Sequence, residues 1–409
     1  MRLPVHVADV LHTLGMHVLQ RLLPVAGLFH AKLRRRTASE RALRDAISIQ
    51  HPPCVWAHAA SMGELEQLVP VFERLRDARA DVRIVVTCTS PSGIDHAQRL
   101  RRLIDDAAYL SVDTPSNARR WLDTIQPNVV LIDRYDVWRN HIVEASRRGV
   151  PIVLINATTP SSANGVLRAW TADTYRRCAS IVAVASVDAE ALTALTGRSI
   201  ECLSDTRNDR LIDRIRRPDP AITAYRRSDG ITLVIGSSWP DDERLVISAL
   251  NSTGFKGRCI VVPHEPTEDA VRAVEATLPC TRWSRSTPST EGHLVVDSVG
   301  HLLSIYAVAD AVWVGGGFGT GVHSLTEPAA YGVPVACGPH VDRARDAAPM
   351  AEAGALTLCI EEHDVATWLT TVVYDAEQRR KSGAAARDYV RARSGASDII
   401  AERLIALLS

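Results

Sequence analysis

Short apolar runs alternate with amphipathic stretches along most of the chain, from Cys54 onward. The first half carries five such runs: VWAHAA, RIVVTCT, NVVLID, PIVLINA and SIVAVAS. Apolar strands that alternate with helical patterns are typical of parallel sheets whose strands are joined by crossover helices. The pattern therefore predicts an α/β domain in this half of the chain.

The alternation weakens between residues 201 and 230 and then restarts. Polar residues and two prolines, Pro218 and Pro220, interrupt it there, as is typical of a connection between domains. The second series comprises ITLVIGSS, CIVVPH, HLVVDS, AVWVGGG and VPVACG. We expect two Rossmann-like, doubly wound domains facing a central cleft that binds the ligand. The predicted ranges are 37–210 for the first domain, 211–229 for a linker, and 230–409 for the second domain with C-terminal helices.

Residues 1–36 form a distinct amphipathic segment. Polar residues and Pro24 interrupt its apolar positions, so no run reaches the roughly 18 to 20 apolar residues that span a bilayer. Basic residues follow the apolar stretch, which argues against a signal peptide. The helix could lie on an anionic membrane surface, or it could pack its apolar face on the domain. The apolar positions are Val7, Val10, Leu11, Leu14, Val18 and Leu22, and the basic ones are Lys32, Arg34, Arg35 and Arg36.

Composition narrows the choice of partners. Among 409 residues, 47 basic and 47 acidic side chains balance, so no overall positive field favours nucleic acid. The eight cysteines show neither a C-x-x-C pair nor zinc-ligand spacing. This usage indicates reduced, structural thiols in a cytoplasmic protein.

The segment from Gly315 to Glu327 is the strongest candidate binding site. It follows a buried apolar run and contains five glycines, at 315, 316, 317, 319 and 321, before a predicted helix start. Glycines let the backbone approach an anion closely, and free N–H groups at a helix start favour negative charge. The spacing matches neither a P-loop nor a dinucleotide fingerprint. We expect a phosphate-binding loop, and the alternative is a turn without a ligand.

Two helix starts share the pattern S-x-x-E: Ser61 with Glu64, and Ser324 with Glu327. Each pair could form a capping box, in which the two side chains satisfy the first backbone N–H groups of the helix. Glu327 could instead accept two ribose hydroxyls. Glu64 could be a general base, and Gly63 beside it leaves room for a substrate.

These motifs stand in an ordered series that resembles the 3-deoxy-D-manno-octulosonic acid (Kdo) transferases. The series covers most of the chain, and A-S-M-G-E and G-G-G-F-G-x-G-x-H are its most specific parts. The resemblance implies a GT-B fold and an inverting glycosyltransferase that moves Kdo from CMP-Kdo to a lipid A precursor. It also implies that no metal or other cofactor is needed, and that the protein works at the cytoplasmic face of the bacterial inner membrane. The motifs include HAASMGELEQLVPVFERL, TSPSGIDHA, DRYDVWRNHI, SDTRNDRL, GSSWPDDE, VVPHEPTED and GGGFGTGVHSLTEPAAYGVPVACGPH.

The resemblance also implies roles for single residues. Glu64 matches the catalytic base, with Ser61 and Gly63 at the turn that positions it, and Asp136 lies on the acceptor side. Glu327 matches the carboxylate that holds the CMP ribose. The remaining donor-side residues are Gly236, Ser237, Ser238, Pro263, His264, Gly316, Gly317, Gly319, Gly321, His323 and Ser324.

Three residues depart from the family's usual pattern. Ser324 stands where asparagine is common, Asn208 where an aromatic residue is usual, and Asp136 where glutamate is frequent. A GT-B transferase with another sugar or acceptor therefore stays open, as does a non-catalytic sugar-nucleotide-binding protein. Arg207 and Asp209 could form a surface salt bridge or lie at the cleft.

Overall fold

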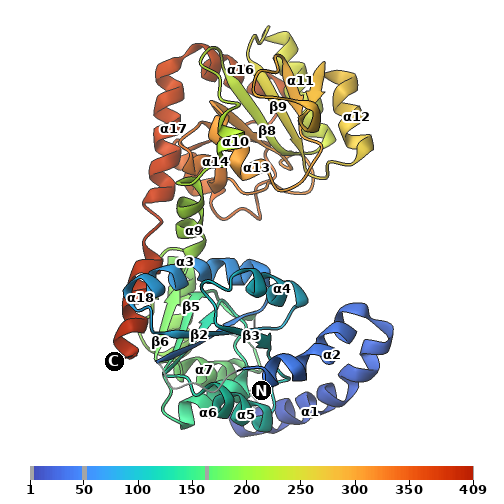
Figure 1. The fold of residues 1–409 in the computed structure, drawn as a ribbon. Helices are drawn as coiled ribbons and strands as arrows, with labels where there is room; N and C mark the ends of the chain where they lie inside the picture. Colours follow the sequence, from blue (N-terminus) through green and yellow to red (C-terminus); the bar gives the residue numbers. More distant parts are fainter. Residues whose placement is uncertain (1–3, 48–52, 162–164, 409) are drawn as a thin grey trace. The chain divides into compact units, whose positions relative to one another are not determined.

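A computed structural model describes residues 4–47, 53–161 and 165–408, which form two compact units (Figure 1). The first unit comprises Met1–Arg210 with Ser394–Ser409, and the second comprises Leu211–Arg393. Each unit has its own seven-stranded sheet, in which every recorded strand pair is parallel. The predicted α/β class with two doubly wound domains is confirmed.

The sheet of the first unit has the order β3-β2-β1-β4-β5-β6-β7. Amphipathic helices cover both of its faces with their apolar sides, which explains why its strands are continuous apolar runs in the sequence. On β1, Val55 packs with Leu68 of α3, while its neighbour Trp56 points to the other face and packs with Trp121 of α5. The elements are β1 (Cys54–Ala59), α3 (Met62–Ala78), β2 (Arg83–Cys88), α4 (Pro91–Arg99), β3 (Asp106–Tyr109), α5 (Pro115–Ile125), β4 (Val129–Asp133), α6 (Arg139–Arg147), β5 (Ile152–Ala157), α7 (Arg168–Arg176), β6 (Ser180–Ala183), α8 (Ser186–Thr196) and β7 (Glu201–Cys202). Helix α9 (Thr206–Ile215) begins in this unit and ends in the second.

The second unit repeats this plan with the strand order β10-β11-β9-β8-β12-β13-β14. Two apolar clusters again fill the two faces of the sheet, and Trp313 of β12 is fully buried in one of them. The elements are α10 (Pro220–Thr223), β8 (Thr232–Ser238), α11 (Pro240–Ser252), β9 (Arg258–Pro263), α12 (Glu268–Thr277), β10 (Cys280–Arg282), β11 (His293–Val295), α13 (Leu302–Ile305), β12 (Ala311–Val314), α14 (Thr326–Ala330), β13 (Val335–Cys337), α15 (Ala347–Glu352), β14 (Leu356–Leu358), α16 (Glu362–Tyr374) and α17 (Ala376–Arg391).

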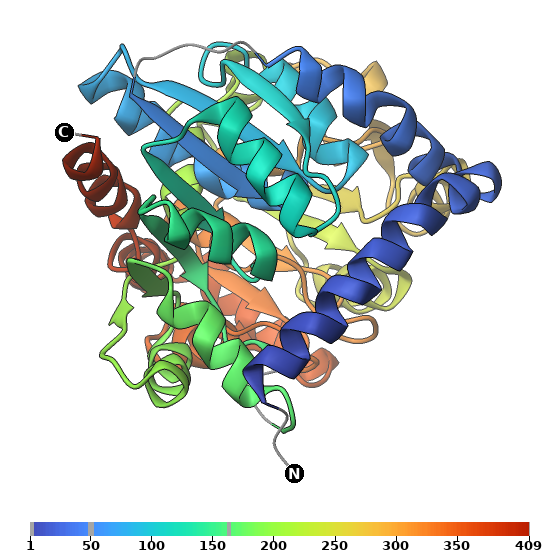
Figure 2. The same cartoon turned by 90° about the horizontal axis from the view of Figure 1, so that it is seen from below.

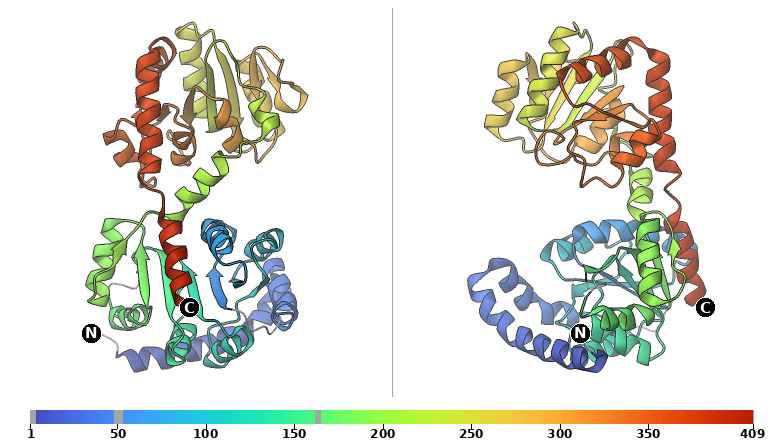
Figure 3. Two further views of the ribbon diagram at one scale, coloured as in Figure 1. Left: turned by 60° about the vertical axis from the view of Figure 1, so that its left-hand side comes forward. Right: turned by 180° about the vertical axis from the view of Figure 1, so that it is seen from behind.

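The predicted domain limits are wrong at two places. Residues 211–229 are not a separate linker, because Ile222 and Tyr225 are buried in the core of the second unit. The last helix, α18 (Ala396–Leu407), belongs to the first unit (Figure 3). It packs on α3 and buries Ile400 and Leu404 there.

Asp209 explains how α18 is held on the first unit. Its buried carboxylate accepts the backbone N–H groups of Gly395 and Ser397 at 2.5 and 2.8 Å, next to the start of the helix. The interpretation of Asp209 as part of a surface salt bridge is therefore wrong. A carboxylate at a helix start satisfies free N–H groups and favours the helix dipole.

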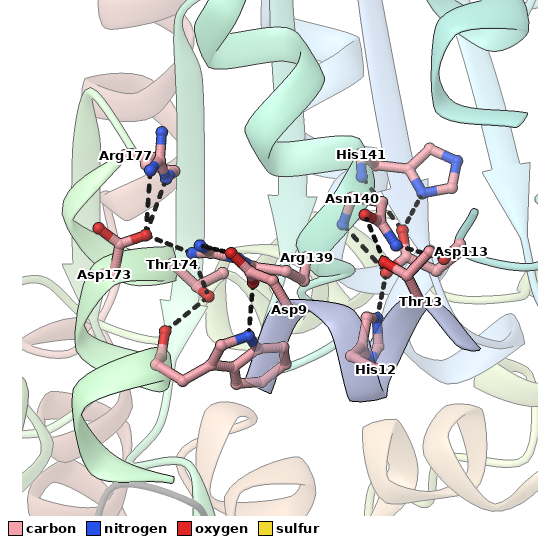
Figure 4. Close-up of polar contacts among 11 residues, drawn as sticks. Asp9, His12, Thr13, Asp113, Arg139, Asn140, His141, Asp173, Thr174 and Arg177 are labelled. Atoms are coloured by element: carbon pink, nitrogen blue, oxygen red, sulfur yellow. Dashed lines mark hydrogen bonds and ion pairs between the residues drawn. The ribbon is translucent and has the colours of Figure 1, made fainter. Parts of the chain in front are cut away.

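The N-terminal helices α1 (Val5–Phe29) and α2 (Ala31–Asp45) lie along the first unit (Figure 2). Polar residues attach α1. Asp9 accepts from the Arg139 guanidinium at 2.8 Å, as Figure 4 shows. Asp9 also accepts from the Trp170 indole at 2.8 Å. His12 lies 2.7 Å from the Asp113 carboxylate. The predicted amphipathic helix is thus present, with its polar side on the protein.

The apolar side of α1 is open to solvent. Five of the predicted apolar positions, Val10, Leu11, Leu14, Val18 and Leu22, are 55% to 58% exposed. The alternative that this face packs against the domain is therefore wrong. Among the described residues, no helix combines the length and the apolar character that crossing a membrane would require.

Candidate active site

The start of α3 carries the predicted base. Ser61 is the N-cap residue, and its hydroxyl oxygen accepts the Gly63 N–H at 3.3 Å. The same hydroxyl donates to the Glu64 carboxylate, and the Tyr135 hydroxyl lies 3.5 Å from the other carboxylate oxygen. A Cβ added to Gly63 would come no nearer than 3.8 Å to Ser61 Oγ, so the glycine leaves open space beside the half-buried Glu64.

Asp136 lies at the same edge of the sheet as Glu64. Glu64 follows β1 and Asp136 follows β4, and these two strands are neighbours. Burial, followed by the charges of Glu64 and Asp136, raises the pKa of the Cys88 thiol, at the end of β2, to about 12. Both carboxylates are therefore close enough to act on one thiol, and the structure brings the two predicted residues together.

A buried chain of hydrogen bonds leads to Asp136. Its Oδ2 lies 2.8 Å from His58 Nε2, and His58 Nδ1 lies 3.0 Å from Thr87 Oγ1. The Trp56 indole N–H donates to the same Thr87 oxygen at 2.9 Å. No local pattern in the sequence marks His58 or Thr87, because they meet only when β1 and β2 pair.

Two residues in left-handed backbone conformation support this edge. Arg134, with φ of +61°, donates to Gln67 at 2.9 Å and to Asp205 at 2.7 Å. Asn156, with φ of +50°, donates to Thr206 at 2.8 Å. The left-handed conformation costs free energy for a residue other than glycine, and residues held in it cluster at functional sites. The only sequence signal for them is their position, just after or at the end of an apolar run.

Four predicted donor-side residues meet in the second unit. Ser237 Oγ lies 3.0 Å from the ring nitrogen Nδ1 of His264. The backbone N–H of His264 donates to the Ser238 carbonyl at 2.9 Å. The His264 and His323 rings stack with centroids 4.3 Å apart. Burial lowers the pKa of His323, and the charge of His264 lowers it further. Pro263, the last residue of β9, pairs with Ser238 and brings His264 to this position.

Three backbone amides of the glycine loop make hydrogen bonds within the protein. The Gly316 N–H donates to the Asp242 carboxylate at 2.8 Å. The N–H groups of Gly319 and Gly321 donate to the Gly316 carbonyl at 3.1 and 2.9 Å. These three amides are therefore occupied within the protein, and an anion would depend on other donors.

Packing explains why glycine stands at two positions of this loop. Gly316 has φ of +92°, and a Cβ there would lie 2.2 Å from the Gly321 carbonyl oxygen. A Cβ at Gly317 would lie 2.5 Å from the Gly338 nitrogen. A Cβ at Gly319 or Gly321 meets nothing within 4 Å, so the open side of the loop lies at these two residues.

Asp242 was missed although it stands in the GSSWPDDE segment. Its carboxylate accepts from Gly316, from the Trp239 N–H at 3.1 Å and from the Trp313 indole at 3.2 Å. Burial raises the pKa of Asp242. Asp242 therefore joins the start of α11 to the glycine loop, a link between segments about 75 residues apart that only the folded sheet creates.

The start of α14 differs from the prediction. Its N-cap residue is Leu325, and Ser324 Oγ instead lies 3.4 Å from Thr326 Oγ1. Glu327 lies in the first turn, near Tyr306, whose pKa is raised by burial and further by the charge of Glu327. A Cβ at Gly236 would lie 2.3 Å from the Tyr306 hydroxyl, so Gly236 is required by packing.

Known Kdo transferases are similar to this chain. The model of the 3-deoxy-D-manno-octulosonic acid (Kdo) transferases matches residues 31–210. A Kdo transferase of Chlamydophila psittaci is 26% identical over 343 residues, which is 80% of this chain and 79% of that protein. The chain is thus similar to Kdo transferases over most of its length. This similarity identifies it as a glycosyltransferase, as the resemblance of its motifs predicted.

Solved structures share the fold of this chain. UDP-GlcNAc 2-epimerase of Neisseria meningitidis has a TM-score of 0.64 at 13% identity, and covers 86% of this chain and 100% of its own. MurG of Acinetobacter baumannii has a TM-score of 0.57 at 14% identity, and covers 87% and 100%. The predicted GT-B fold is confirmed.

Proposed function

We propose that this protein moves Kdo from CMP-Kdo to a lipid A precursor, with inversion, in the synthesis of the lipopolysaccharide core. The acceptor binds the first unit at Glu64 and Asp136, and the donor binds the second unit at the glycine loop. The observation that supports this most is the Glu64 carboxylate at the start of α3, held by Ser61 beside an uncrowded glycine in a chain similar to Kdo transferases.

In the proposed reaction, Glu64 takes the proton from the attacking acceptor hydroxyl. The hydroxyl oxygen forms a bond to the anomeric carbon of Kdo from the face opposite CMP, and the bond from that carbon to the phosphate oxygen breaks. The electron pair leaves with CMP. The Ser61 hydroxyl donates to one carboxylate oxygen and so orients Glu64.

On the donor side, Ser237, His264 and His323 surround the position of the negatively charged donor, and Glu327 accepts the ribose hydroxyls. Glycines 319 and 321 give the donor room, because a Cβ at either position would touch nothing. CMP-Kdo is a substrate, and the proposed reaction uses no cofactor. Positioning of the substrates and stabilisation of the charge that develops in the transition state then supply most of the rate enhancement.

The reaction is tested with purified protein, CMP-Kdo generated in place and a tetra-acylated lipid A precursor. We expect a product heavier by Kdo in the mass spectrum. Product only with another activated sugar would favour a different GT-B transferase. Binding of CMP without product on any acceptor would favour a non-catalytic sugar-nucleotide-binding protein.

We also propose that α1 lies on an anionic membrane at the cytoplasmic face of the inner membrane. Its exposed apolar side chains form the contact, and the exposed Lys32 and Arg34 add positive charge. Arg35 contributes less, because it is paired with Asp95. The acceptor is a lipid, so this contact brings the first unit to its substrate.

Cosedimentation with vesicles tests the membrane contact. Replacing Leu14 and Leu22 together by serine should reduce binding to vesicles that contain phosphatidylglycerol. Val187→Ser is the matched control, because Val187 is also exposed, at 64%, but lies on α8. Equal binding of the Leu14/Leu22 variant and the wild type would refute the proposed contact.

A further inference from the structure

His58 is enclosed beside the acceptor site and cannot itself reach a substrate. Its side chain is 4% exposed, and both ring nitrogens lie within hydrogen-bond distance of protein oxygens. Asp136 covers Nε2, and Thr87 covers Nδ1. Any contribution of His58 to the reaction must therefore pass through one of these two neighbours.

The direction of the hydrogen bonds fixes the proton on the His58 ring. An indole N–H can only donate, so Thr87 Oγ1 accepts from Trp56. Thr87 is fully buried, and its own hydroxyl proton needs an acceptor. Among the described residues, His58 Nδ1 is the acceptor recorded for it. Nδ1 is then unprotonated, and Nε2 carries the proton that is donated to Asp136 Oδ2.

In Asp136, one carboxylate oxygen, Oδ2, is held by the hydrogen bond from His58, and the other, Oδ1, is open. No hydrogen bond within the described part of the chain reaches Oδ1, and the side chain is 17% exposed. Asp136 lies in an irregular segment between β4 and α6, so the backbone alone does not hold it as a helix or strand would. The bond from His58 supplies this constraint.

We propose that His58 is a positioning residue for acceptor binding: its Nε2–H holds Oδ2 of Asp136 so that Oδ1 accepts a hydrogen bond from a hydroxyl or amino group of the acceptor sugar. Thr87 and Trp56 set the tautomer that makes this possible. The inference rests on the proposed function, because it assigns the acceptor to the site that contains Glu64 and Asp136.

Titration calorimetry with the deacylated disaccharide of the acceptor tests this, because binding is measured without turnover. We expect Asp136→Asn and His58→Asn to raise the Kd of the disaccharide about 10- to 100-fold, as loss of a hydrogen bond to a charged group does. His58→Gln places an amide N–H near Nε2 and should recover most of the affinity. The Kd for CMP should not change in any of these variants.

Coupling between the two residues separates positioning from a general structural role. The double variant of His58→Asn with Asp136→Asn should bind no more weakly than Asp136→Asn alone, because both changes remove the same interaction. The proposal would be overturned if the Kd increases of the two single variants multiplied in the double variant. Normal disaccharide affinity in His58→Asn would overturn it as well.

Thr87 provides a second test that leaves His58 in place. Thr87→Val removes the hydroxyl at nearly constant volume and should weaken disaccharide binding, whereas Thr87→Ser should not. Equal affinity of both variants would overturn the tautomer argument. Failure of the proposed transfer reaction is distinguished by the wild type: disaccharide binding that depends on His58, without product from CMP-Kdo, refutes the reaction but not the positioning role.

Discussion

The helix starts of α3 and α14 share the pattern S-x-x-E, yet they are built differently. In α3, Ser61 is the N-cap residue and its hydroxyl contacts both Gly63 and Glu64. In α14, the N-cap residue is Leu325, so Ser324 lies outside the helix. The helix lengths also differ, with 17 residues in α3 and five in α14.

The difference shows that the pattern marks a helix start without determining the contacts made there. In a capping box, the glutamate accepts the N–H of the N-cap residue. In α3, the recorded partners of Glu64 are the Ser61 and Tyr135 hydroxyls instead. The capping interpretation therefore does not account for Glu64, which strengthens its interpretation as a base, while Glu327 lies in the first turn of α14 near Tyr306.

The largest effect should come from Glu64→Gln. Loss of a general base typically costs about 10²- to 10⁴-fold in rate. We expect kcat for Kdo transfer to fall by this amount, measured from the initial rate of product formation by mass spectrometry. The Kd for CMP should stay at the wild-type value. Normal turnover would remove Glu64 from the reaction.

Glu327→Gln should affect binding rather than rate. We expect the Kd for CMP to rise about 10- to 100-fold, because a carboxylate that accepts ribose hydroxyls makes strong, charge-assisted bonds. Titration calorimetry with CMP measures this change. Glu352→Gln is the control, an exposed glutamate of the same unit. Unchanged CMP affinity in Glu327→Gln would mean that this residue is structural.

Replacing the two serines tests the difference in capping directly. Ser61→Ala should destabilise the first unit by about 0.5–2 kcal/mol, because it removes an N-cap side chain. Ser324→Ala should change the free energy of unfolding by less than about 0.5 kcal/mol, as exposed substitutions without a cap usually do. Urea unfolding followed by circular dichroism gives both values. Equal destabilisation would contradict the assignment of the two caps.

The smallest effect concerns His323, next to the α14 start. Because its pKa is lowered in the folded protein, the unfolded chain takes up a proton first as the pH falls below about 6.5. Acidification from pH 7.5 to 5.5 should therefore lower the stability of the second unit. His323→Gln should reduce this dependence of Tm on pH, measured by calorimetry. The same slope in both proteins would show that other groups cause it.

Much of the fold could be predicted from the sequence, because strands buried on both faces must be apolar throughout. The apolar runs that contain Val55 and Val312 could therefore be recognised as strands, and they form β1 and β12 in the structure. The position of α18 could not be predicted. Its amphipathic pattern requires burial of one face, but nothing local identifies α3 as its partner.

The site shows the same division. Motifs located Glu64, Asp136 and the glycine loop, and the structure brings the first two to one sheet edge. Their roles in transfer stay predictions. His58 and Asp242 were not found, because each acts on a residue from a distant part of the sequence. The spacing of the glycines also could not show that Gly316 serves packing within the loop rather than an anion.

The return of the chain to the first unit at Ser394 makes the second unit an insertion within the first. During synthesis, residues 1–210 leave the ribosome well before Ile400 and Leu404 exist to cover α3. The second unit is contiguous and can fold while the first still exposes this apolar surface to chaperones. The second unit can therefore complete its fold before the first, although the first begins earlier in the chain, and a truncation near the C-terminus would remove part of the first unit.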